Sequence, residues 1–99
     1  MREWAQRHRN DVRQMINHLH EVFAVREGQY AVAADALPPA VRRVYHRLLL
    51  VIHPDRNASD TIEKQICATV LFAELRNAFE AFEAWVALQE EEAEDADDD

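Results

Sequence analysis

Residues 39–56 read PAVRRVYHRLLLVIHPDR, and this stretch decides the fold. Apolar residues recur in it at intervals of three and four, which predicts an α-helix with one buried face over residues 39–52. Pro54 disfavours helical geometry at the residue before it, so we expect the helix to end there. The residues that follow, 53–60, are polar and rich in turn formers, which predicts a short loop.

Two further helices flank this stretch. Residues 10–24 and residues 61–89 both carry apolar residues at the spacing of one helix face. Asp60 is suited to cap the longer helix, with Glu63 three positions later as in a capping box. The sequence therefore predicts an all-α domain of three helices, in which the helix over 39–52 pairs antiparallel with the last one. The buried stripe expected on the last helix is Ile62, Ile66, Val70, Leu71, Leu75, Ala78, Phe79, Phe82 and Val86.

The two ends of the chain differ from this domain. Residues 90–99 hold eight acids and no base, whereas residues 1–89 are formally neutral. Like charges in a block repel one another, and without an apolar stripe the segment has nothing to dock, so we expect a disordered acidic tail. Residues 1–9 are mostly polar, and the sequence leaves open whether they extend the first helix or fray, and whether Trp4 is exposed. The division is thus an N-terminal extension, a domain over 10–89 and a tail.

Composition excludes several classes of function. The net charge of −8 and the lack of interleaved aromatic residues on the basic helix disfavour nucleic-acid binding. Cys67 is the only cysteine, and His18 and His20 point to different faces of a helix, which is poor geometry for a metal. No apolar run approaches the roughly 20 residues of a membrane span, and no nucleophile–base pair indicates an enzyme. We expect a cytoplasmic monomer without metal or cofactor.

The loop and the preceding helix carry the candidate site. His53 and Asp55 flank Pro54, which fixes φ and lowers the entropic cost of holding the turn in one shape. Asp55 can accept paired hydrogen bonds from a partner arginine, and His53 can donate or accept a proton near neutral pH. Acids are absent from residues 39–52, so no ion pair within the helix accounts for its bases. We expect an acidic partner surface to be attracted by Arg42, Arg43, Arg47 and Arg56.

This arrangement resembles the J domain, the module of DnaJ-type co-chaperones that activates the ATPase of DnaK-type heat-shock chaperones. As in that family, the tripeptide His53-Pro54-Asp55 follows a basic helix and precedes a helix that runs antiparallel to it. Residues 44–56 (VYHRLLLVIHPDR) and residues 72–79 (FAELRNAF), with Phe82 after them, look like the J domains of auxilin and cyclin-G-associated kinase. The segment LHEVF over residues 19–23 is also similar to that subgroup. Arg56 stands where lysine is commoner in the family.

The resemblance implies a mechanism in which the hydrolytic groups belong to the partner. The basic helix would dock on the chaperone, and the tripeptide would engage its nucleotide-binding domain near the linker, which favours the ATP-hydrolysing state. Such allostery between proteins requires differential binding to two states of the partner. The likeness to auxilin implies a role in clathrin-coat disassembly, with clathrin reached through a larger parent protein. A helical protein-interaction adaptor and a J protein that serves a different client remain the alternatives.

Overall fold

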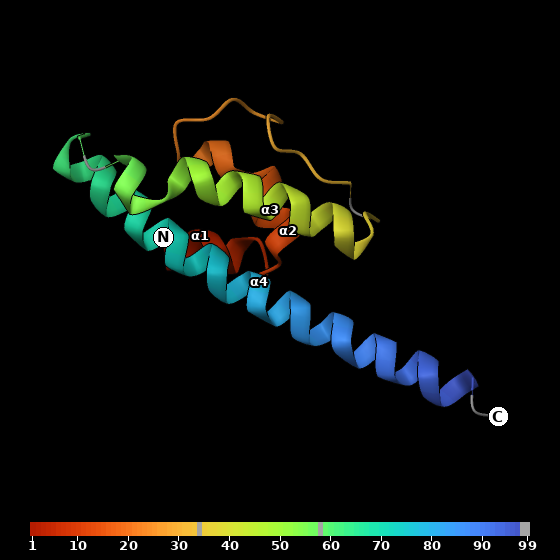
Figure 1. Cartoon of the computed structure of the whole chain (residues 1–99). Helices are drawn as coiled ribbons and strands as arrows, with labels where there is room; N and C mark the ends of the chain where they lie inside the picture. Colours follow the sequence, from red (N-terminus) through yellow and green to blue (C-terminus); the bar gives the residue numbers. More distant parts are fainter. Residues whose placement is uncertain (34, 58, 98–99) are drawn as a thin grey trace.

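The computed structural model describes residues 1–33, 35–57 and 59–97, and all regular elements in this part of the chain are helical (Figure 1). Four α-helices follow one another: α1 (Arg2–Arg7), α2 (Val12–Asn17), α3 (Pro38–Ile52) and α4 (Ile62–Asp97). Two short 3₁₀ turns lie between them, η1 (Leu19–Glu21) and η2 (Pro54–Asn57). The predicted all-α class is confirmed.

Helices α3 and α4 form the antiparallel pair that the sequence predicts. Near the middle of α3, Tyr45 stacks on Phe79 of α4, with ring centroids 3.8 Å apart. Just past the end of α3, His53 meets the ring of Phe72, which lies earlier in α4. Residues later in α3 therefore pack against residues earlier in α4, so the two helices run in opposite directions (Figure 1).

The core is one cluster to which all four α-helices contribute. Its most deeply buried side chains come from α2, η1, α3 and the middle of α4, so the short N-terminal helices cover the α3–α4 pair. The cluster consists of Trp4, Ala5, Val12, Met15, Ile16, Leu19, Val32, Val41, Tyr45, Leu48, Ile52, Leu71, Leu75, Ala78, Phe82 and Val86.

Residues 1–9 are part of this core, which the predicted boundary at residue 10 did not anticipate. They neither extend the next helix nor fray but form a separate helix, α1, in which Trp4 is only 4% exposed. The indole N–H of Trp4 donates to a carboxylate oxygen of Glu21 at 3.1 Å, which satisfies the one polar group of the side chain. The chain reverses after α1 because Arg9 and Asn10 take φ values of 60° and 53°, which no helix continues.

The predicted helix over 10–24 is shorter in the structure. Of the two residues whose type suits a cap, Asn10 and Asp11, it is Asp11 that caps α2, since its carboxylate accepts from the backbone N–H of Arg13 at 2.9 Å. The helix ends at Asn17, whose side chain donates to the carbonyl of Val32 at 2.8 Å and accepts from its N–H at 2.6 Å. Asparagine competes well for backbone groups in this way, and here it ties the connection between α2 and α3 to the body.

The first turns of α4 also differ from the prediction. Ile62, Ile66 and Val70 are exposed, whereas Leu71 and the later members of the predicted stripe face the core. Nine residues separate Ile62 from Leu71, and at 3.6 residues per turn they lie about 180° apart around the helix. One straight helix cannot bury both against the same neighbour. The cap also falls one residue later than predicted, since the N–H of Lys64 donates to the hydroxyl of Thr61 at 3.3 Å.

At its other end α4 is longer than the sequence led us to expect. The backbone remains helical from residue 90 through Asp97, and Figure 1 shows this part projecting beyond the other helices. Alanine and glutamate, which dominate residues 90–94, have high helix propensity, and that offsets part of the repulsion among the acids. Within the described residues, α4 included, no helix combines the length and the apolar character needed to cross a membrane.

The burial of Trp4 predicts that residues 1–9 are required for stability. We expect Trp4→Ala to lower the free energy of unfolding by about 3–5 kcal/mol, because it opens a cavity and removes one of the hydrogen bonds to Glu21. Trp85→Ala is the matched control, since Trp85 is 50% exposed, and it should cost less than about 1 kcal/mol. Urea unfolding followed by circular dichroism measures both. Equal destabilisation by the two variants would place residues 1–9 outside the cooperative unit.

Candidate protein-docking site

The loop after α3 begins where the sequence predicts. Helix α3 ends at Ile52, and His53 takes an extended conformation (φ −58°, ψ 135°), as expected for a residue that precedes proline. The N–H of His53 still donates to the carbonyl of Leu49 at 3.0 Å. One residue later the chain enters η2, in which the N–H of Arg56 donates back to the carbonyl of His53 at 3.0 Å.

Asn57 holds this loop from the inside, and sequence analysis did not find it. It is the only buried polar residue among those the structure describes. Its side-chain amide donates to the carbonyl of His53 at 2.9 Å and to that of Val51 at 3.3 Å. These carbonyls lie at the end of α3 and have no partner within the helix. The sequence marks Asn57 only as a turn former, a property it shares with its neighbours.

His53 and Asp55 are presented to solvent on the turn. The side chain of Asp55 is 94% exposed and that of His53 is 46% exposed. The N–H of Asp55 donates to Nδ1 of His53 at 3.1 Å, which in a neutral ring leaves the proton on Nε2. The edge-to-face contact with Phe72, at 5.4 Å between ring centroids, fixes the plane of the imidazole. The turn therefore offers an oriented N–H donor beside a carboxylate acceptor.

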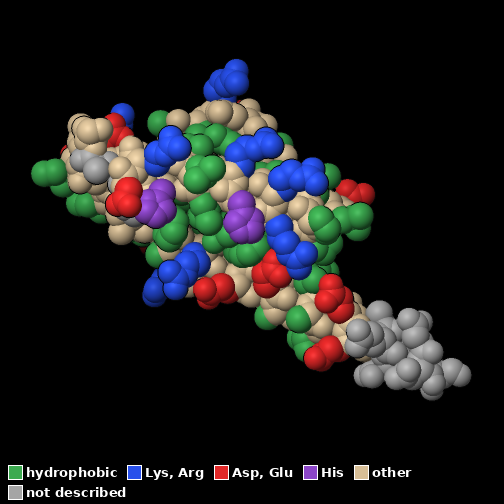
Figure 2. Space-filling view, viewed as in Figure 1, with side chains coloured by type: hydrophobic (Ala, Val, Ile, Leu, Met, Phe, Trp, Pro, Cys, Tyr) green, Lys and Arg blue, Asp and Glu red, His purple; other side chains and the backbone are tan. Residues whose placement is uncertain are grey.

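Three of the four predicted arginines are exposed on α3 and in the turn after it. Arg43 and Arg47 lie four residues apart on one face of α3, and Arg56 lies in η2. Among the residues that the structure describes, none of the three has a carboxylate within ion-pair distance. Figure 2 shows basic side chains gathered over α3, with acidic side chains along α4 below them. The site thus keeps an uncompensated positive face.

Arg42 does not belong to this free positive face, which corrects the prediction. Its guanidinium binds Glu83 of α4 in a bidentate fashion, with Nε and Nη2 donating to the two carboxylate oxygens at 2.6 and 2.9 Å. This hydrogen bonding raises the pKa of Arg42 and holds the pKa of Glu83 below its ordinary value. The search for partners within the helix missed Glu83 because it lies 41 residues away in the sequence. Arg42 joins α3 to α4.

Leu50 joins the site although sequence reasoning did not include it. It lies three residues after Arg47 and is 61% exposed, in line with the arginines and the turn. The only signal in the sequence is that Leu50 falls outside the apolar face expected for this helix, which consists of Val41, Val44, Tyr45, Leu48, Val51 and Ile52. An apolar side chain among bases gives the face a contact that survives salt.

The remaining histidines and the cysteine form internal contacts. His8 stacks on His18 at 4.2 Å between ring centroids, and Nε2 of His8 lies 2.7 Å from a carboxylate oxygen of Glu21. The thiol of Cys67 donates to the carbonyl of Val22 at 3.1 Å. Within the described part of the chain, no three His, Cys, Asp or Glu side chains are grouped so as to hold a metal ion.

The chain matches no model of a known protein family. Comparison with solved structures also gives no match. The resemblance to J domains therefore rests on the residues of this chain alone, and the function that follows from it is a proposal.

The bond between Arg42 and Glu83 predicts an acid-dependent loss of stability. Because the folded-state pKa of Glu83 is lowered from 4.5, its contribution is present above that value and is lost as the pH falls through the folded pKa. Glu83→Gln should therefore be less stable than the parent chain near neutral pH and lose less stability on acidification. Urea unfolding across this pH range measures the difference.

Glu80→Gln is the control for this experiment, because Glu80 also lies on α4 but forms an exposed pair with Arg76 within the same helix. If Glu83→Gln and Glu80→Gln follow the parent chain identically at every pH, the bond between α3 and α4 contributes nothing.

Proposed function

We propose that this protein is a J-domain co-chaperone, which binds a DnaK-type heat-shock chaperone and stimulates its hydrolysis of ATP. One observation carries the proposal. His53 and Asp55 are exposed on a turn that follows a basic helix directly, and Asn57 and Phe72 hold that turn in one conformation. A side chain that is 94% exposed, as Asp55 is, does little for the stability of its own chain.

The chemistry of the turn supports recognition of a protein partner. The carboxylate of Asp55 can accept two parallel hydrogen bonds from a partner arginine, which is a strong and directional contact. The Nε2 proton of His53 offers a donor beside it. Arg43, Arg47 and Arg56 add a positive field that would speed encounter with an acidic surface. Since the turn is already held in place, little entropy is lost on binding.

The proposed mechanism leaves the hydrolysis to the partner. In this mechanism the face formed by Arg43, Arg47 and Leu50 docks on the chaperone, and His53 and Asp55 contact its nucleotide-binding domain. Stimulation then requires that this contact be stronger in the ATP-hydrolysing state than in the resting state. Arg42 contributes by fixing α3 on α4 and not by contact, because its guanidinium is already bound to Glu83.

We extend the proposal to the disassembly of clathrin coats in the cytoplasm. The likeness of residues 44–56 and 72–79 to the auxilin subgroup supports this process. In that case contact with clathrin is made through a larger parent protein. A J protein with another client would keep the same turn and the same basic face. An assay of clathrin release from coats therefore tests whether clathrin is the client.

Substitutions in the turn test the proposed activity. His53→Gln and Asp55→Asn should each abolish the stimulation of a DnaK-type ATPase while leaving helicity and melting unchanged. Single-turnover ATP hydrolysis, with and without clathrin coats, measures the effect. Asp60→Asn, an exposed change in the same connection, is the matched control and should stimulate as the parent chain does. Full stimulation by the Asp55→Asn variant would contradict the proposal.

Charge reversal on α3 tests the docking face separately. The double variant Arg43→Glu/Arg47→Glu should lose chaperone binding, and binding by the parent chain should weaken as salt is added. Arg7→Glu/Arg26→Glu is the control, because it changes the net charge equally at two exposed positions outside α3. An adaptor that does not act through a chaperone would bind its partner through this face but would be indifferent to Asp55→Asn.

A further inference from the structure

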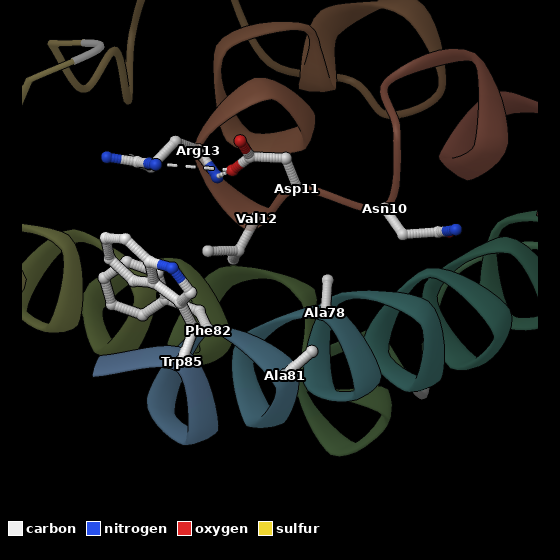
Figure 3. Close-up of a pocket in the computed structure, with 8 residues that line it drawn as sticks. All are labelled: Asn10, Asp11, Val12, Arg13, Ala78, Ala81, Phe82 and Trp85. Carbon is white, nitrogen blue, oxygen red and sulfur yellow. Dashed lines mark hydrogen bonds and ion pairs between the residues drawn. The ribbon is translucent and has the colours of Figure 1, made fainter. Parts of the chain in front are cut away.

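A groove runs between the start of α2 and the middle of α4, far from the turn after α3. Figure 3 shows Val12 reaching down from α2 toward Ala78 and Ala81 of α4, with the rings of Phe82 and Trp85 at one end. Because the side chains of the two alanines are short, a cavity of about 270 Å³ remains above them.

A second cavity continues the groove past Trp85. It has a volume of about 430 Å³, and its other wall is formed by the end of the connection before α3, including Leu37, and by Pro38 at the start of α3. Both cavities share Phe82 and Trp85 as lining residues. Leu37 is 73% exposed, and Leu88, three residues after Trp85 on α4, is exposed as well. Leu37 and Trp85 thus line one cavity, and Leu88 follows Trp85 by less than one turn of α4. Exposed apolar side chains of this kind are typical of protein interfaces.

The charge around this apolar surface is negative. Asp35 and Glu90 line the second cavity and are exposed. The one base in the groove, Arg13, lies 3.6 Å from a carboxylate oxygen of Asp11 and 5.7 Å from the centroid of Phe82, so its charge is compensated in place. In the sequence, residues 90–99 hold eight acids and no base.

We propose that this groove docks a basic amphipathic helix of a partner protein. The apolar face of that helix would cover Leu37, Trp85 and Leu88, and its lysines or arginines would face Asp35 and Glu90. The straight course of the groove along α4 suits a helix laid into it, which is a common mode of peptide recognition. Complementary charge selects a basic occupant over an acidic one.

A second copy of this chain fits the groove less well than such a partner. Two copies that met along this part of α4 would bring two blocks of eight acids into the same assembly, and like charges oppose such an approach. The groove also lies at the opposite end of α3 from His53. Since α3 has 15 residues, the two surfaces are about 22 Å apart along the helix and can be occupied together.

A designed peptide of about four helical turns, with leucines on one face and lysines beside them, is a suitable probe. We expect the labelled peptide to bind the full chain in a fluorescence anisotropy titration. Trp85→Ala and Leu88→Ala should each weaken the affinity at least tenfold, and Asp35→Asn/Glu90→Gln should weaken it and reduce its salt dependence. Leu50→Ala, which removes an equally exposed leucine from the face of α3, should leave the affinity unchanged.

Three outcomes would overturn the proposal. The first is equal affinity of the peptide for the parent chain and for both groove variants, each shown by melting to be folded. The second is equal binding of a peptide in which glutamates replace the lysines. The third is a dimer in sedimentation experiments that Trp85→Ala converts to a monomer, since a second copy would then be the occupant. Loss of chaperone stimulation in the turn variants leaves this result untouched.

Discussion

The stack of Tyr45 on Phe79 sets the register of α3 against α4, and both surfaces of the molecule depend on that register. The rings lie 3.8 Å apart and nearly parallel, and burial raises the pKa of the Tyr45 hydroxyl. With this contact fixed, Arg42 comes opposite Glu83 on one side and His53 comes opposite Phe72 on the other. A slip of one turn would break both contacts and would turn the loop away from its support on α4.

The sequence predicts the parts of the fold that depend on neighbours along the chain. Pro54 ends α3 and Asp11 caps α2 because each acts within a few residues of itself. The contact between Trp4 and Glu21 and the one between Asn17 and Val32 join segments 15 or more residues apart. Periodicity carries no information on such contacts, and for that reason it merged α2 with η1 and left residues 1–9 outside the domain.

In the candidate site, too, the sequence predicts the local features and misses the long-range contacts. The turn, Arg43, Arg47 and Arg56 are exposed where the sequence puts them, because exposure at the end and on the polar face of a helix follows from local pattern. Arg42 has the same local pattern, and only its distance to Glu83 in three dimensions separates it from the others. Sequence analysis missed Leu50 and Asn57 because their burial is unusual for their residue types. An exposed leucine and a buried asparagine run against the usual preferences of these residues.

Positive and negative charges are concentrated on different surfaces of the molecule. Uncompensated bases lie along the exposed face of α3 and in η2, whereas Asp35 and Glu90 lie beside the groove at the start of α3. The basic surface would repel a basic partner and the acidic surface would repel an acidic one. Two partners of opposite charge would therefore not compete for the same surface. Because α3 separates the surfaces by about 22 Å and is fixed to α4 along its length, the domain can hold both partners at a set distance. That arrangement would suit a protein whose task is to bring a chaperone to something else.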